Sequence, residues 1–233
     1  MKNNKDWYDG DFNPNVCRLL IRGHDVTWVS KPENIEAPMK KDMPKLTYLA
    51  YGTSITQGAK SSGAMMQYPS QVGRNLKTNV INMGVRSSAY CEEAIAKYIN
   101  KEYNWDFATL EISVNMLGQN RSVDEFKAVA TNFIKILAEA NPTKLIFCIS
   151  ILPFFRDLGL GQDKKIVSNP KEYRDALEKI CKTCDYKNVY YIRGEEILKD
   201  ITGLSTDLIH PNDIGNIEIG RELAAKISEY IKV

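Results

Sequence analysis

Three residues in this sequence have the types and spacing needed to activate a serine hydroxyl. Ser54 lies in the stretch YLAYGTSITQGAKSSG, residues 48–63, where an apolar run breaks into a glycine-bounded turn. The chain has only two histidines, His24 and His210, so a mechanism that needs a general base near neutral pH has little choice. Asp207 precedes His210 by three residues, and its carboxylate can fix the imidazole tautomer. The set suits a hydroxyl nucleophile, a histidine that carries its proton and a carboxylate that orients the histidine.

His210 is the better of the two histidine candidates. Pro211 disfavours helical geometry at His210, which suits a loop that presents the ring just before a helix begins. His24 stands in the segment GHD between two β-like stretches, where a surface position is expected.

Acyl transfer through a serine also needs hydrogen-bond donors for the developing oxyanion. The Ser54 amide is expected at the start of a helix. Gly84 lacks a side chain that would shield its own amide, and Asn115 carries a carboxamide donor. We therefore expect Ser54, Gly84 and Asn115 to form the oxyanion hole.

The elements that must position these residues form a regular pattern from Leu46 onward. Short apolar runs alternate with longer amphipathic ones, which is typical of βαβ units in a parallel sheet. The predicted strands are LTYLAY (46–51), NVINM (79–83), FATLEIS (107–113), KLIFCISIL (144–152) and NVYYIR (188–193). We expect an α/β fold, a three-layer α/β/α sandwich with a five-stranded parallel sheet of the flavodoxin-like type. Ligands of such sheets bind outside the carboxyl ends of the strands, where the candidate residues and TDLIHPND (206–213) would meet.

Helix starts are also visible in the sequence. The segment 122–125, SVDE, has the pattern of a capping box, and Asn169-Pro170 places a proline where a first helical turn accepts it. An apolar stripe predicts a last helix from about Asp213 to the C-terminus.

The first 45 residues differ in character. The stretches VCRLLIR (16–22) and VTWVS (26–30) flank GHD and predict a β-hairpin. The charged, proline-containing segment 31–45 predicts a surface connector. We interpret residues 1–45 as a hairpin and connector rather than an independent domain, and residues 46–233 as one domain.

Composition narrows the class of partner. The 233 residues carry 31 basic and 29 acidic side chains, a net charge of +2, without a dense basic block, so neither nucleic acid nor a membrane surface is an expected partner.

The start, MKNNKDWYDGDF, is too polar for a signal peptide, and the longest apolar run, from Leu145, is too short to span a bilayer. Five scattered cysteines favour reduced thiols and a cytoplasmic location. The pair Cys181 and Cys184 lacks a second pair at zinc spacing, and no metal or cofactor is expected.

In chain order, the candidate residues resemble the motifs of the SGNH hydrolases, or GDSL-like esterases, over roughly Leu46 to the C-terminus. The resemblance places the four namesake residues of the family at Ser54, Gly84, Asn115 and His210, and Asp207 completes the triad. It implies a serine esterase that cleaves small acyl esters through an acyl-enzyme, without a metal or cofactor. The substrate would be a small-molecule ester.

Two departures from the family pattern leave the substrate open. The typical G-D-S is Gly52-Thr53-Ser54 here, and G-x-N-D is Ser113-Val114-Asn115-Met116. Acetyl esters, and sugar esters by analogy with some family members, are the first candidates. Acyl transfer to another alcohol uses the same triad and stays an alternative. Residues that follow the predicted strands and could shape the pocket, or equally pack in the core, are Arg86, Tyr90, Met116, Leu117, Phe154, Phe155 and Arg156.

Other interpretations of the Ser54 loop are weaker. Serine at a strand-to-helix junction can be only an N-cap. A phosphate-binding P-loop needs four residues between its glycines and a lysine directly after the second, whereas five residues separate Gly52 from Gly58 and Ala59 precedes Lys60. The α/β-hydrolase elbow needs a glycine where Thr56 stands. A catalytically inactive binding module is a further alternative, and the presence of the whole serine, histidine and aspartate set argues against it.

Overall fold

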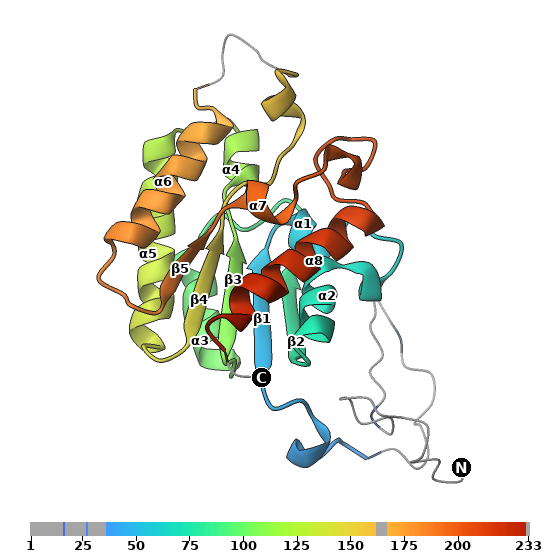
Figure 1. The fold of residues 1–233 in the computed structure, drawn as a ribbon. Helices are drawn as coiled ribbons and strands as arrows, with labels where there is room; N and C mark the ends of the chain where they lie inside the picture. The colour runs from blue at the N-terminus through green and yellow to red at the C-terminus, as the bar shows by residue number, and fades with distance from the viewer. Residues whose placement is uncertain (1–15, 17–26, 28–35, 162–166, 232–233) are drawn as a thin grey trace.

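The core of the structure is a five-stranded parallel sheet (Figure 1). The computed structural model describes residues 16, 27, 36–161 and 167–231. The strands are β1 (Thr47–Gly52), β2 (Asn79–Gly84), β3 (Phe107–Glu111), β4 (Leu145–Ile149) and β5 (Val189–Ile192). Their spatial order is β2-β1-β3-β4-β5, and every neighbouring pair is parallel. The predicted flavodoxin-like order and the five predicted strands are confirmed.

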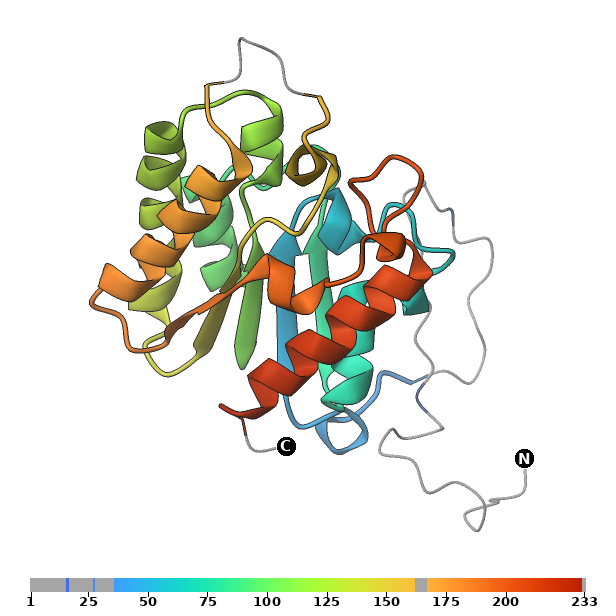
Figure 2. The same cartoon turned by 45° about the horizontal axis from the view of Figure 1, so that its top comes forward.

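Helices cover both faces of the sheet (Figure 2). The helices are α1 (Ser54–Gln57), α2 (Tyr68–Asn75), α3 (Glu93–Glu102), α4 (Val114–Gly118), α5 (Val123–Ala140), α6 (Pro170–Thr183), α7 (Gly194–Ile197) and α8 (Asp213–Ser228). Short 3-10 turns are η1 (Lys40–Asp42), η2 (Ala64–Met66), η3 (Phe155–Leu158) and η4 (Ile201–Gly203). No helix in the described ranges is both long and apolar enough to cross a membrane.

Two apolar clusters, one on each face, join the helices to the sheet. Leu49 and Tyr51 of β1 belong to the cluster that α3, α5 and α6 cover, whereas Tyr48 and Ala50 belong to the cluster that α2 and α8 cover. Successive side chains of a strand point to opposite faces, so a strand buried on both sides needs an unbroken apolar run. This requirement explains the sequence of β1.

The predicted helix starts are confirmed. Ser122 and Glu125 form a capping box at α5, and Asn169 caps α6 with Pro170 in its first turn. The last helix begins at Asp213, as expected, and ends at Ser228. The predicted hairpin within residues 16–30 lies outside the described residues except for positions 16 and 27, and the proposed division at residue 45 stays a prediction.

Strand β4 ends at Ile149, earlier than its apolar run predicts, because the ladder stops at the bond from the Ser150 amide to the Ile192 carbonyl and the following carbonyls bond outside the sheet. The Ser150 hydroxyl accepts a hydrogen bond from the Gly194 amide, and the carbonyls of Ile151 and Leu152 accept from the side chain of Arg174. The chain therefore leaves the sheet at its carboxyl edge.

The strand register brings the candidate loops together. Gly52, the last residue of β1, is level with Gly84 in β2 and with Glu111 in β3. Because parallel strands end at the same edge, the loops that begin at these three residues converge there.

Candidate active site

Ser54, His210 and Asp207 form one hydrogen-bonded chain at the carboxyl edge of the sheet. Ser54 Oγ lies 2.8 Å from His210 Nε2, and His210 Nδ1 lies 2.9 Å from Asp207 Oδ2. When Nδ1–H donates to the carboxylate, Nε2 is left to accept the serine proton. The geometry matches what a serine nucleophile and its general base require.

Asp207 is held as a carboxylate by its surroundings. Partial burial opposes ionisation, but hydrogen bonds from the amide and ring of His210, the amide of Ile209 and the hydroxyl of Ser205 outweigh it and hold the pKa of Asp207 well below its usual range. Lys60 Nζ, on a half-exposed side chain, lies 3.9 Å from Asp207 Oδ2. The sequence analysis did not identify this neighbour.

The nucleophile turn shows that Ser54 is not the helix cap. Thr53 is the N-cap of α1, and its Oγ1 accepts from the amide of Ile55, so Ser54 is the first helical residue. Gly58 ends this short helix in a left-handed conformation, with φ of 75°. Ser54 itself is 7% exposed, so most of its side chain is shielded from solvent.

The candidate oxyanion donors differ in the hydrogen bonds that they already make within the protein. The side chain of Asn115 donates one hydrogen bond from Nδ2 to the Ser88 carbonyl at 2.8 Å, and a carboxamide nitrogen has a second proton to give. The Gly84 amide donates to Asn82 Oδ1 at 2.8 Å. A Cβ at Gly84 would lie 2.2 Å from the Gln57 nitrogen, so the glycine permits the close approach of α1 to β2.

The loops that follow β2 and β3 contain left-handed backbone at residues other than glycine. Ser87 has φ of 53°, and Ser113, just before α4, has φ of 110°. The Ser113 hydroxyl is buried and has no hydrogen-bond partner among the described residues. Strain of this kind accumulates at functional sites, where the surrounding structure over-determines it. Sequence reasoning missed both positions because no glycine marks them.

The predicted pocket residues fall into two groups. Met116, Leu117 and Phe154 are buried in the core, where burial indicates packing. Arg86 is exposed, and Tyr90 is half-buried with the Arg121 guanidinium 4.9 Å from its ring centroid. Two further candidates lie side by side in η3, since the Arg156 guanidinium is 6.0 Å from the ring centroid of Phe155.

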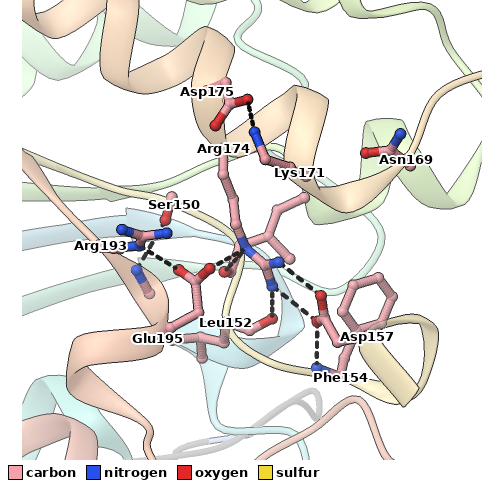
Figure 3. Close-up of polar contacts among 12 residues, drawn as sticks. Ser150, Leu152, Phe154, Asp157, Asn169, Lys171, Arg174, Asp175, Arg193 and Glu195 are labelled. Carbon is pink, nitrogen blue, oxygen red and sulfur yellow. Dashed lines mark hydrogen bonds and ion pairs between the residues drawn. The ribbon is translucent and has the colours of Figure 1, made fainter. Parts of the chain in front are cut away.

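A buried arginine fixes the loop that leaves β4 (Figure 3). Arg174 of α6 donates to both carboxylate oxygens of Asp157, at 2.7 and 2.9 Å, and its Nε lies 3.3 Å from Glu195 Oε1. Its remaining bonds go to the carbonyls of Ile151 and Leu152. A guanidinium with five donors in a fixed fork suits this arrangement.

The same loop supports the loop that carries the histidine. The Phe155 amide donates to the Leu208 carbonyl at 2.9 Å, and Leu208 adopts a left-handed conformation with φ of 52° between Asp207 and His210. The Arg174 cluster therefore braces the loop that carries Asp207 and His210. Within the described ranges, no group of three or more His, Cys, Asp or Glu side chains is placed to hold a metal ion.

The family of the chain follows from its sequence as a whole. The sequence profile of the GDSL-like Lipase/Acylhydrolase family matches residues 46–228. The chain belongs to this family. No curated protein sequence matches it. In this GDSL-like chain the matched residues include Ser54, Asp207 and His210.

Solved structures share the fold of this GDSL-like protein. A Bacteroides ovatus protein described as a GDSL-like lipase is 25% identical, with a TM-score of 0.68 over 81% of this chain and 54% of that one. A salicylyl-acyltransferase from a tetracycline biosynthetic pathway is 16% identical, with a TM-score of 0.71 over 82% and 56%. A family two carbohydrate esterase from Clostridium thermocellum, in complex with cellohexaose, is 14% identical, with a TM-score of 0.65 over 84% and 66%. The chain spans about half the length of the first two.

Proposed function

We propose that this GDSL-like protein hydrolyses esters of small acyl groups through an acyl-enzyme on Ser54. The observation that carries the proposal is the continuous hydrogen-bonded chain from Ser54 through His210 to Asp207. Its family is one of lipases and acylhydrolases, which supports the same reaction class.

The proposed reaction has two balanced steps. Ser54 Oγ attacks the ester carbonyl carbon while its proton passes to His210 Nε2, and the resulting imidazolium then protonates the leaving alkoxide as the ester bond breaks. Water next attacks the acyl-enzyme and gives its proton to His210, which returns it to Ser54 as the acid leaves. Asp207 keeps the ring oriented and stabilises its charged form.

The proposed oxyanion hole consists of the Ser54 amide and the Asn115 carboxamide. The Ser54 amide is at the first turn of α1, and one proton of Asn115 Nδ2 remains beyond its bond to Ser88. The third sequence candidate, Gly84, would first have to release its bond to Asn82. We therefore build the proposal on the first two donors.

Acetylated carbohydrates are the first substrates to test. Two structural neighbours support this choice: the carbohydrate esterase in complex with cellohexaose and a carbohydrate acetylesterase family member from Sinorhizobium meliloti, which is 13% identical with a TM-score of 0.62 over 79% of this chain and 98% of that one. Acyl transfer is the second candidate, because another neighbour is a salicylyl-acyltransferase and the same triad serves both reactions.

The decisive experiment compares the wild type with Ser54→Ala. We expect the wild type to hydrolyse p-nitrophenyl acetate faster than the butyrate, and an organophosphonate to label Ser54, as read by mass spectrometry. The variant should lose turnover by about 10⁴-fold or more and lose the label. Ser62→Ala, at an exposed serine of the same loop, is the matched control. Unchanged turnover in a folded Ser54→Ala protein would disprove the proposal, and a wild type without activity or label would favour a binding module.

A further inference from the structure

A buried carboxylate lies directly behind the nucleophile turn. Glu111, the last residue of β3, is 4% exposed. Its Oε2 accepts hydrogen bonds from the Thr53 amide at 2.8 Å, the Thr53 hydroxyl at 2.6 Å and the Thr56 hydroxyl at 3.1 Å. The two threonines flank Ser54, so one side chain fixes the turn on both sides of the nucleophile.

The packing around this carboxylate is tight. A Cβ at Gly52 would lie 2.0 Å from Thr56 Oγ1 and 2.9 Å from Glu111 Oε2. Gly52 and Glu111 are also paired in the register of β1 and β3. The glycine therefore allows the turn to sit against the carboxylate, and the turn has little room to shift while the bonds persist.

The donors around Glu111 match the ionised side chain. A carboxylate is purely an acceptor, whereas a neutral carboxyl group must donate one of its own bonds. The three bonds to Oε2 are strongest when the side chain is ionised, because a hydrogen bond to a charged acceptor is roughly twice as strong as one between neutral groups. Ionisation has a cost, because burial raises the pKa of Glu111 to about 7 although the bonds from Thr53 and Thr56 act to lower it.

The neighbouring titratable groups stay neutral over the working pH range. The Tyr68 hydroxyl, from α2, bonds to Thr56 Oγ1, and Tyr48 of β1 lies next to Tyr68. Burial raises the pKa of each tyrosine well above its usual value. No ion pair links Glu111 to a basic residue within the part of the chain that the structure describes. The protonation of Glu111 is therefore the one charge change behind the turn near neutral pH among these described neighbours.

We propose that Glu111, in its ionised form, is a positioning residue that holds the Ser54 turn in its reactive geometry. This role rests on the proposed function, since it acts through Ser54 and does not touch the substrate. Protonation of Glu111 would weaken the three bonds to Oε2 and so loosen the turn that carries Ser54. Sequence analysis missed Glu111, although a carboxylate that ends an apolar buried strand is an available clue.

The first test compares Glu111→Gln with Thr109→Val. Glutamine has the same shape and keeps one acceptor oxygen but removes the negative charge. Thr109 lies two residues earlier on the same face of β3 and bonds to Tyr48, and it reaches the turn only through Tyr68. We expect Glu111→Gln to lower kcat for p-nitrophenyl acetate by about 10- to 100-fold with KM nearly unchanged, because small displacements of a reacting group have effects of this size. Thr109→Val should keep kcat within about twofold even if it is less stable.

The second test measures the pH dependence of phosphonate labelling of Ser54, first in the wild type, which does not depend on the folding of a variant. Below about pH 7 the labelling rate of the wild type should fall more steeply than a single protonation can account for, with a slope above one on a plot of log rate against pH, because the bonds to Glu111 weaken over this range. In Glu111→Gln the slope should not exceed one. A slope of one or less in the wild type, or an unchanged kcat in folded Glu111→Gln, overturns the role of Glu111 alone. A wild type that is never labelled at Ser54 overturns the proposed function instead.

Discussion

Ser54 Oγ and His210 Nε2 lie 2.8 Å apart although 156 residues separate them in the sequence. The parallel register places the turn after β1 at the carboxyl edge of the sheet, and the loop before α8 reaches the same edge. Asp207 lies in the same loop as His210 and forms the second hydrogen bond of the series, with His210 Nδ1. The relationship therefore depends on one local motif and on one long-range contact between two loops.

Replacement of the triad carboxylate should remove most of the turnover. In Asp207→Asn, an amide facing His210 Nδ1 favours the tautomer whose Nε2 carries a proton and cannot accept one from Ser54. We expect kcat to fall by about 10²- to 10⁴-fold, measured with p-nitrophenyl acetate. Asp213→Asn, at a carboxylate that accepts from the Ser62 amide, is the control and should retain activity. A loss of less than tenfold in Asp207→Asn would contradict the assigned role.

Removal of the carboxamide of Asn115 should affect kcat more than KM. Loss of one oxyanion donor lowers turnover by roughly 100- to 1000-fold, because the bond strengthens in the transition state. Asn115→Ala can be compared with Gln119→Ala, which loses a bond to the Tyr90 hydroxyl in the same region. If the two variants have equal kcat values, Asn115 is not a donor.

Replacement of Ser113 by glycine should stabilise the protein. The φ of 110° strains any residue with a Cβ, and the Ser113 hydroxyl is buried with no partner among the described residues. We expect a gain of about 1 kcal/mol or more in the free energy of unfolding, after the entropic cost of glycine. Ser70→Gly, inside α2, should instead lose about 1 kcal/mol. Urea unfolding of both variants measures the contrast.

Replacement of the buried Arg174 should strongly lower the free energy of unfolding. Arg174→Met leaves Asp157 and the carbonyls of Ile151 and Leu152 without their donor, and breaking a buried ion pair typically costs about 3–5 kcal/mol. Lys171→Met is the control, because Lys171 pairs with Asp175 on the exposed surface of the same helix (Figure 3). That pair contributes about 1 kcal/mol at most. Equal unfolding midpoints for the two variants would refute the bracing role.

The buried Glu111 should make stability fall as pH rises. Burial raises its pKa from 4.5 to about 7, so between these values the folded state binds more protons than the unfolded state and stability declines with increasing pH. Relative to Glu111→Gln, the wild type should lose up to about 3 kcal/mol of unfolding free energy between pH 4.5 and pH 8. Urea unfolding of both proteins at the two pH values tests this; a constant difference between them would show that Glu111 does not titrate in this window.

Local patterns in the sequence were sufficient to predict the architecture and to select Ser54, His210 and Asp207 as the candidates that the structure brings within hydrogen-bond distance. Apolar runs predict β1 to β5, and the capping residues Ser122 and Asn169 predict where α5 and α6 begin. Such patterns are visible because burial on both faces and helix capping each demand particular residues within a few positions. The order of Ser54, Asp207 and His210 along the chain then places all three at one edge of a parallel sheet.

Only the tertiary structure decided which groups surround those residues. Thr53, and not Ser54, caps α1; Glu111 lies behind the turn; the Gly84 amide is bonded to Asn82; and Arg174 braces the β4 loop. The bonds of Thr53 to Ile55 and of Gly84 to Asn82 join residues two positions apart, whereas those of Glu111 and Arg174 join residues that meet only through packing. The left-handed backbone at Ser113 could not be predicted from the sequence either. The surrounding structure holds this residue in a conformation that serine does not prefer locally.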